Sequence, residues 1–451
     1  MATKMSSTTK KIIIMLLITF GLLIVYRLGA YITLPFINTD ILFNSSKSNG
    51  LNFGFLDVFS GGALSNFSVL CLGISPYITA SIVIQLLQMD IVPRFKELAE
   101  EGEEGRKKLN QYTRYIALGL AFVQSLTLVI GININYSGAY FISDLDFVSS
   151  YPALLYIYLA IVATAGTAFC LWLAELITAH GLGNGSSMLI VAGILATFPQ
   201  MFADLIDQLI KNEETRNIWV FVAVIVILIA IIVFIVFMEG AERKIPIQYA
   251  NRPAAASFQG KSDSNIPIKL NSASVIPVIF ASTLLSLPTT IISLTGMDTS
   301  KGTAGYWLMQ IFSTTSTTTA NNVTSVSINA IGLAVYIVLI VIFSFFYSFL
   351  QLNPEQMADN LQKQNAYVPG VRPGEETTGY ISRVLFKITV LGATYLSIVA
   401  VLPIVMTVVF NLPSSAQIGG TSLIIVVGVA IETWKQLKQT KQEKQYRGFI
   451  E

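Results

Sequence analysis

Residues Phe59 to Ile78 have the sequence FSGGALSNFSVLCLGISPYI and lead directly into an apolar run that continues to Val92. The stretch is too apolar for a solvated loop. Its Gly, Ser, Asn and Pro residues are nevertheless unfavourable in a regular membrane-spanning helix. The sequence therefore places an element of intermediate character directly before a clean apolar helix.

The rest of the chain is strongly apolar. Of its 451 residues, 53% are hydrophobic and 12% are charged, and the mean hydropathy is +0.65. This composition predicts an all-α polytopic membrane protein, because ten apolar runs have about the length that a helix needs to cross roughly 30 Å of hydrocarbon. We expect the first run to be a retained span, because it lacks a convincing signal-peptide cleavage site. The runs are residues 12–37, 73–92, 115–132, 153–174, 187–206, 218–238, 272–294, 331–352, 388–410 and 415–431.

Basic residues are distributed unevenly between the loops. Of the 28 Lys and Arg residues, 23 lie at the two ends and in alternate loops, whereas the opposite loops hold only Lys47, Lys211, Arg216 and Lys301. Loops rich in Lys and Arg stay on the cytoplasmic side of a membrane. The pattern predicts that both termini are cytoplasmic, which agrees with an even number of spans.

Side chains suited to catalysis or metal binding are scarce. His180 is the only histidine, and Cys71 and Cys170 lie in apolar surroundings that favour core positions over a disulfide or a metal pair. The GLGNGSS string from Gly181 to Ser187 either cradles a phosphate or forms a tight turn, and the missing strand and lysine favour the turn. We expect no enzyme activity, metal or cofactor; an intramembrane serine protease is a remote alternative.

Charged residues within the apolar runs are also rare. Arg27 is the clear case, and near a helix end its side chain can reach the membrane interface. No intramembrane carboxylate stands out, although ion-coupled transporters usually need such a group. A small-solute secondary transporter is therefore the weaker alternative for the function.

The second and seventh runs begin with a matching pattern. ISPYI starts at Ile74 and VIPVI starts at Val275, and five spans separate the two. Either the match is chance, or the chain consists of two pseudo-symmetric five-helix halves, residues 1–210 and 211–451, with the working pathway between them.

Two polar side chains lie at similar depths in these runs. Gln85 follows Ile78 by seven residues, and Asn271 precedes Ile279 by eight. Both therefore lie roughly 10 to 12 Å to the cytoplasmic side of those isoleucines. Either the two side chains form a hydrogen-bonded pair of order 1 kcal/mol, or each bonds the backbone of a neighbouring helix.

Two cytoplasmic loops, residues 239–270 and 352–387, are large for a compact helical bundle. They contain ERKIPIQYANR from Glu242 and NPEQMADNLQKQNAYVPGVRPG from Asn353. Basic loops are often only topology signals. The mixture of basic, aromatic and Pro-Gly elements favours the docking of a partner, with anionic RNA as one candidate.

Several strings, in order along nearly the whole chain, resemble the bacterial SecY family, whose members form the channel of the Sec protein translocase. The segment Gly296 to Asn329 matches none of these strings and is expected to be a solvated connector. The strings are FSGGALSNFSVLCLGISPYITASIVIQLL, GEEGRKKLNQYTRY, GLGNG, ERKIPIQYANR, IKLNSASVIPVIFAS, NPEQMADNLQ with PGVRPG, GGTSLIIVVG and YRGFI.

The resemblance implies two five-helix halves around a central pore in the bacterial plasma membrane. Through it, secretory polypeptides would cross unfolded, and transmembrane segments would pass sideways into the lipid bilayer. The implied partners are SecE-like and SecG-like subunits, the ATPase SecA, the ribosome, and translocating polypeptides with their signal sequences.

The resemblance also assigns residues to four sites. At the family position directly after GNG, serine replaces isoleucine, which leaves the seal of the ring in question. The pore ring is Ile74, Ile78, Ser186, Ile190, Ile279 and Ile425. The lateral gate has the second and third spans on one side and the seventh and eighth on the other. It contains Thr79, Gln85, Asn271, Thr283 and Leu287.

The third site is the plug, residues 56–72, which the resemblance makes a short re-entrant helix that occupies the outer funnel at rest. The fourth is a partner-docking set in the two large loops, where Asn251 replaces a lysine that is common in the family. The plug residues are Phe59, Gly61, Gly62, Leu64, Asn66 and Phe67, and the docking residues are Arg243, Lys244, Arg252 and Arg372.

Overall fold

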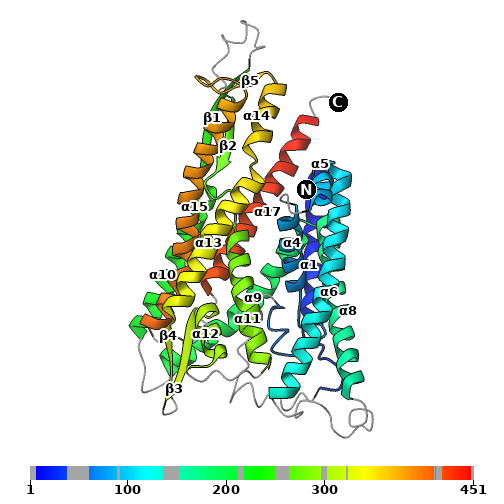
Figure 1. The fold of residues 1–451 in the computed structure, drawn as a ribbon, viewed down its shortest axis with the longest axis vertical. Coiled ribbons are helices and arrows are strands. Elements are labelled where there is room, and N and C mark those ends of the chain that lie inside the picture. Colours follow the sequence, from blue (N-terminus) through cyan, green and yellow to red (C-terminus); the bar gives the residue numbers. More distant parts are fainter. Residues whose placement is uncertain are drawn as a thin grey trace, which may run out of the picture.

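The computed structural model contains long helices that run side by side along the longest axis of the molecule (Figure 1). It describes residues 7–37, 60–88, 92–135, 152–211, 218–249, 264–295, 302–320, 323–410, 412 and 419–447. Each of the ten predicted apolar runs coincides with one helix, which confirms the all-α polytopic class. Seven helices in the described part of the chain are long and apolar enough to cross a membrane, while α4 and α11 are apolar but shorter.

The ten helices divide evenly between residues 1–210 and 211–451. The first five are α1 (Ser7–Gly29), α4 (Ser75–Leu87), α6 (Glu103–Asn135), α8 (Pro152–His180) and α9 (Gly185–Ile206). The second five are α10 (Ile218–Gly240), α11 (Ile276–Thr295), α13 (Ala330–Gln351), α15 (Glu375–Val409) and α17 (Gly419–Arg447). Short helices connect them: α5 (Pro93–Glu100), a π-helix (Asp207–Lys211), α12 (Ala304–Phe312) and α14 (Pro354–Lys363).

Several helices extend beyond the apolar runs that predicted them. The largest extensions are the start of α6 at Glu103, the start of α15 at Glu375 and the end of α17 at Arg447. Both α6 and α15 carry glutamates in their first turn, where negative charge is favourable at the positive end of the helix dipole. Hydropathy locates only the lipid-facing part of a helix, so these polar turns were not predicted.

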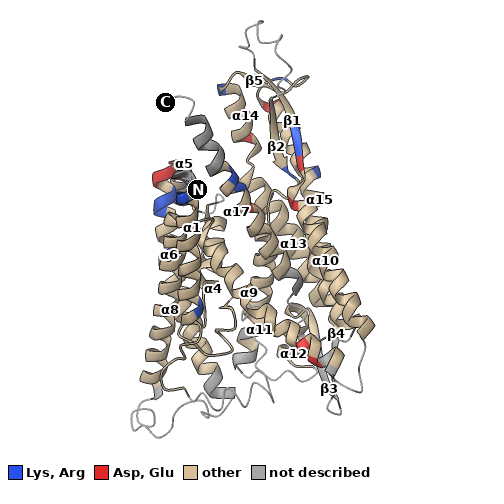
Figure 2. Ribbon diagram, turned by 180° about the vertical axis from the view of Figure 1, so that it is seen from behind, with Lys and Arg blue, Asp and Glu red and all other residues tan. Residues whose placement is uncertain are grey.

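A small three-stranded sheet unites the two large loops at one end of the molecule. Its strands are β1 (Glu242–Tyr249), β2 (Ser264–Lys269) and β5 (Ala366–Tyr367), in the order β2-β1-β5. Both pairings are antiparallel. Buried Ile245 and Ile268 pack with Ile388 of α15, which fixes the sheet on the end of that helix. Lys and Arg residues gather at this end, on β1 and around α5 (Figure 2).

The described residues of the segment Gly296 to Asn329, which was expected to be a solvated connector, form regular structure. They contain α12 and a hairpin of β3 (Thr315–Ala320) and β4 (Val323–Ile328). Threonine and valine favour extended backbone, which explains the strands. The Asn329 side-chain amide donates to the Gln310 carbonyl at 2.7 Å and ties the hairpin to α12.

Candidate functional pore

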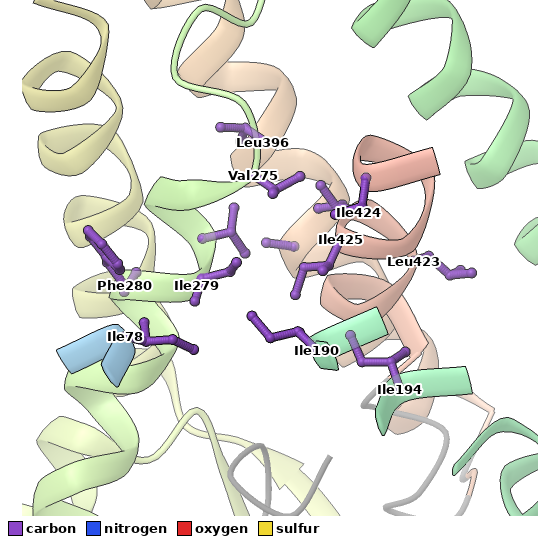
Figure 3. Packing of buried hydrophobic residues seen from close by; sticks show 14 of the residues in the cluster. Ile78, Ile190, Ile194, Val275, Ile279, Phe280, Leu396, Leu423, Ile424 and Ile425 are labelled. Carbon is purple, nitrogen blue, oxygen red and sulfur yellow. The ribbon is translucent and has the colours of Figure 1, made fainter. Parts of the chain in front are cut away.

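A cluster of buried apolar residues lies where α4, α9, α11 and α17 meet. Five of the six residues assigned to the pore ring belong to it, and each has at most 8% of its surface exposed. Figure 3 shows four of their side chains converging from these helices. The five residues are Ile74, Ile78, Ile190, Ile279 and Ile425.

The sixth position, Ser186, does not join this cluster. Its hydroxyl donates to Asn184 Oδ1 at 2.7 Å, and its backbone N–H donates to the same oxygen at 3.1 Å. Asn184 is the N-cap of α9, so Ser186 lies in the first turn of the helix, about one turn before Ile190. The serine thus supports the helix start, while the buried cluster is built from other side chains.

The structure adds apolar residues that the resemblance did not assign. Val275, Phe280 and Ile424 are buried in the same cluster and lie beside the ring isoleucines (Figure 3). Val275 is packed so closely on α17 that a Cβ at Gly428 would lie 2.8 Å from its Cγ1. The spacing shared by ISPYI and VIPVI was a signal for Val275, because Val275 occupies the place of Ile74 in that pattern.

The described part of the predicted plug, residues 60–72, is called the plug segment below. After Ser60 it consists of turns and one bridge residue, Ser68, so the predicted short helix is wrong from Gly61 onward. Gly61 and Gly62 have φ angles of +67° and +82°, and Phe67 has +44°. Left-handed backbone at these positions interrupts a right-handed helix. Phe59 lies outside the described residues.

The plug segment is nevertheless well packed. Leu64 and Phe67 are 3% and 1% exposed, and they form a second buried cluster with Leu34 and Cys71, whereas Asn66 is exposed. Cys71 and Cys170 are both buried, as the sequence predicted.

Backbone hydrogen bonds connect the plug segment to the chain after α1. The Leu34 N–H donates to the Phe67 carbonyl at 2.9 Å, and the Val69 N–H donates to the Ile32 carbonyl at 2.8 Å. Arg27 also donates to this segment, through the Gly61 carbonyl. The sequence analysis did not predict this contact between Arg27 and the plug segment.

The lateral-gate residues lie on α4 and α11, which are in contact, except for Asn271 just before α11. Thr79 donates to the Ser75 carbonyl at 3.3 Å, and Thr283 donates to the Ile279 carbonyl at 2.7 Å, each within its own helix. Leu287 is half-buried on α11. These side chains do not join α4 to α11 through hydrogen bonds among the described residues.

The first alternative for Gln85 and Asn271, a hydrogen bond between them, is not what the structure contains. Asn271 donates to Glu239 Oε1 at 2.6 Å and to the Ser274 carbonyl at 2.9 Å. Gln85 donates to Ser81 Oγ at 3.1 Å, and its own buried oxygen has no hydrogen-bond partner among the described residues. Asn271 therefore binds within residues 211–451, and Gln85 binds within α4.

Glu239 was missed because the predicted sixth span ended at Met238, one residue earlier. It is 6% exposed and forms the penultimate residue of α10. Asn271 is 3% exposed. A buried carboxylate needs such hydrogen bonds to offset its lost hydration, so this pair joins α10 to the start of α11.

The docking residues lie on the sheet end of the molecule. Arg243 and Lys244 are exposed on β1, and exposed Arg372 lies shortly after β5. The pairing of β1 with β5 thus brings the two large loops together. Asn251 and Arg252 lie outside the described residues.

An ion pair connects the same end to α17. Lys435 Nζ donates to Glu242 Oε1 at 2.8 Å, and this hydrogen bond lowers the pKa of the Glu242 carboxyl. The next residue, Gln436, accepts a hydrogen bond from the Gly183 N–H at 2.9 Å. Gly183 lies in the GLGNGSS string, where residues 181–184 form the turn between α8 and α9 that the sequence favoured.

Comparison with known proteins gives matches over nearly the whole chain. The SecY family model matches residues 68–434. Over 439 residues, the chain is 44% identical to the protein translocase subunit SecY of Bacillus licheniformis, covering 96% of each protein. It is 44% identical over 443 residues to the protein translocase subunit SecY of Staphylococcus carnosus, covering 98% of this chain and 97% of that relative.

Solved structures share the fold at lower identity. One, described as "The structure of a protein conducting channel", has a TM-score of 0.64 at 20% identity and covers 95% of this chain and 93% of its own. A SecY structure whose plug domain is described as stabilising the closed state has a TM-score of 0.62 at 20% identity, covering 95% and 92%. Sec61 from a canine ribosome-channel complex has a TM-score of 0.62 at 19% identity, covering 95% and 93%. With the family model matching most of its length, this multi-pass membrane protein belongs to the SecY family.

Proposed function

We propose that this chain is a protein-conducting channel of the bacterial plasma membrane. It moves unfolded secretory polypeptides across the membrane and releases transmembrane segments sideways into lipid. The observation that carries the proposal is the meeting of isoleucines from α4, α9, α11 and α17 in one buried cluster, between helices of both proposed halves (Figure 3). The curated relatives are protein translocase subunits.

An isoleucine constriction suits a channel that must stay closed to ions and open to polypeptides. A narrow apolar passage excludes ions because water does not stably fill it. Ile78, Ile190 and Ile279 each retain a little exposed surface, 5 to 8%. Because the ring side chains form no hydrogen bonds with one another, a passing chain displaces them without breaking polar contacts.

The proposed lateral gate also lacks strong polar closure. It lies between α4 and α6 on one side and α11 and α13 on the other, and α11 contacts the other three helices. The hydrogen bonds of Thr79, Gln85 and Thr283 stay within their own helices. Separation of α4 from α11 therefore costs mainly apolar contacts, which an arriving apolar segment replaces.

The plug segment closes the outer side of this passage at rest. A solved SecY structure is described as having a plug domain that maintains a membrane seal. Here, buried Leu64 and Phe67 fix the segment among protein side chains, the setting in which irregular backbone is tolerated at membrane depth.

The energy for transport comes from outside the chain, from SecA, the ribosome or the proton motive force. A solved Sec61 belongs to a ribosome-channel complex. In this chain, Arg243, Lys244 and Arg372 are exposed at the sheet end and suit contacts with acidic or anionic partners. We place this end and both termini in the cytoplasm, and small SecE-like and SecG-like subunits beside the helices.

The test is transport by the purified protein. The chain is reconstituted into vesicles with its SecE-like and SecG-like subunits, and an unfolded secretory polypeptide is added with SecA and ATP. We expect the polypeptide to become protected from external protease, with no protection when ATP is omitted. Uptake of a small solute without polypeptide protection would instead support the secondary transporter, for which the comparisons give no support.

A further inference from the structure

The guanidinium of Arg27 binds the plug segment. Arg27 lies near the end of α1, and its Nη1 donates to the Gly61 carbonyl. Its Nη2 donates to Tyr31 Oη at 3.2 Å, and the guanidinium carbon lies 5.0 Å from the centre of the Tyr31 ring. No carboxylate of the described residues pairs with Arg27, so a neutral carbonyl of the plug segment is a principal partner of this cation.

Gly61 is held from both sides. A Cβ at this position would lie 3.1 Å from Arg27 Nη1 and 2.9 Å from the Cα of Gly193 in α9. Its φ of +67° also disfavours any side chain. The Gly61 peptide therefore occupies a narrow space between the arginine and α9, and only glycine fits there without displacement.

Neighbouring contacts of α1 are weaker. The Tyr26 hydroxyl donates to the Ser60 carbonyl at 3.4 Å, near the upper limit for a hydrogen bond. The hydrogen bonds of Leu34 with Phe67 and of Val69 with Ile32 join neutral backbone groups. Hydrogen bonds with a charged donor are about twice as strong as neutral ones, so the contact of Arg27 with Gly61 is stronger than each of these bonds.

We propose that Arg27 is a positioning residue that latches the plug segment in the closed channel. The inference rests on the proposed function and deepens it by naming what sets the resting seal. When the plug segment leaves, Arg27 loses the Gly61 carbonyl and must find another acceptor at membrane depth, where acceptors are few. This cost opposes opening and favours return of the segment.

The variant Arg27→Gln tests the latch, because it removes the charge and keeps a donor. Native Cys71 serves as the reporter, since it is 1% exposed and packs with Leu64 and Phe67. In a Cys170→Ala background, we measure labelling of Cys71 by a membrane-impermeant maleimide and the resting ion conductance of reconstituted vesicles. We expect both to rise about tenfold in Arg27→Gln, the factor that corresponds to one charge-assisted hydrogen bond.

Two further variants separate the latch from a general loss of packing. Arg27→Lys keeps the charge but not the planar fork, and it should restore most of the wild-type labelling rate. Arg114→Gln is the matched control, because Arg114 of α6 pairs with Glu175 at 2.6 Å and does not contact the plug segment. We expect it to leave Cys71 labelling and resting conductance unchanged.

Deletion of residues 59–70 distinguishes a failure of the latch proposal from a failure of the channel proposal on which it rests. If the deletion raises conductance and Arg27→Gln changes neither readout, the latch is refuted and the channel proposal stands. If the deletion also leaves conductance at the wild-type level, both the latch and the plug assignment fail. Equal rises in Arg27→Gln and Arg114→Gln would show a packing defect and would likewise overturn the latch.

Discussion

The segments that precede α4 and α11 differ in what holds them, although both helices begin with the same spacing of apolar residues around a proline. The segment before α4, residues 60–74, is tied down by backbone hydrogen bonds and by Arg27. The segment before α11 is fixed by Asn271, which binds buried Glu239 of α10 at 2.6 Å. The segment before α4 is held chiefly through its backbone groups, whereas the segment before α11 is held through a buried pair of side chains.

The hydrogen-bonded pair of Asn271 and Glu239, called the anchor below, is supported by neighbouring contacts. The Leu270 N–H donates to the Ala241 carbonyl at 2.9 Å, and the Ser272 hydroxyl donates to the Lys269 carbonyl at 2.8 Å. A Cβ at Gly392 of α15 would lie 3.0 Å from the Leu270 carbonyl oxygen. From this difference we infer that the two proposed halves serve different purposes: the first would carry a removable stop, and the second a fixed pivot for the proposed gate helix α11.

The largest effect is expected from linking the two helices themselves. Cysteines at Thr79 and Leu287, in a chain without Cys71 and Cys170, should form a disulfide that holds α4 to α11 and abolishes translocation. Reduction should restore export, and each single cysteine should have no effect. Normal export with the bond closed, measured by protease protection, would refute the gate assignment.

A smaller effect is expected from removing the anchor. Glu239→Ala leaves an Asn271 donor buried without its carboxylate acceptor, and we expect a loss of about 1–3 kcal/mol in the free energy of unfolding. Glu239→Gln keeps an acceptor oxygen for Asn271, so its free energy of unfolding should fall by less. Denaturant unfolding of the purified complex measures both, and equal stability of Glu239→Ala and wild type would remove the anchor from the comparison.

A smaller effect again is expected at Ser186, the sixth assigned ring position, which lies outside the buried cluster. Ser186→Ile adds an apolar side chain about one turn before Ile190. The backbone N–H at position 186 still donates to Asn184 Oδ1 in this variant. We expect normal export and a resting ion leak about fivefold lower, the factor for roughly 1 kcal/mol of added burial. A larger leak in the conductance assay would count against placing position 186 at the ring.

The smallest effect is expected from the exposed pair beside the anchor. Lys435 lowers the pKa of Glu242, so the pair contributes stability at neutral pH and loses it as the pH falls through that lowered pKa. Glu242→Gln should cost about 0.2–1 kcal/mol at pH 7, and the difference from wild type should vanish once the pH falls below the lowered pKa of Glu242. A difference that persists in acid would assign another role to Glu242.

The sequence predicted the ten helices and five of the clustered isoleucines, because apolar runs and a closely matched family pattern report on lipid contact and core positions directly. It did not predict the partner of Asn271, since Glu239 lies one residue beyond an apolar run and 32 residues away along the chain. The predicted plug helix was wrong from Gly61 onward, because left-handed Gly61 packs against Gly193 of α9, a contact that the sequence does not reveal. The partner of Arg27 was not predicted, because its acceptor is a backbone carbonyl 34 residues away.

The most direct measurement compares the plug segment with the anchor before α11 while a polypeptide occupies the channel. Cys71 reports on the plug segment, and Ser272→Cys in a chain without the native cysteines reports on the anchor; both positions are buried at rest. With a secretory polypeptide stalled in reconstituted vesicles, we predict that impermeant maleimide labels Cys71 at least about tenfold faster than at rest and labels position 272 no faster. Unchanged labelling of Cys71, or an equal rise at both positions, would contradict the assignment of a removable stop and a fixed pivot.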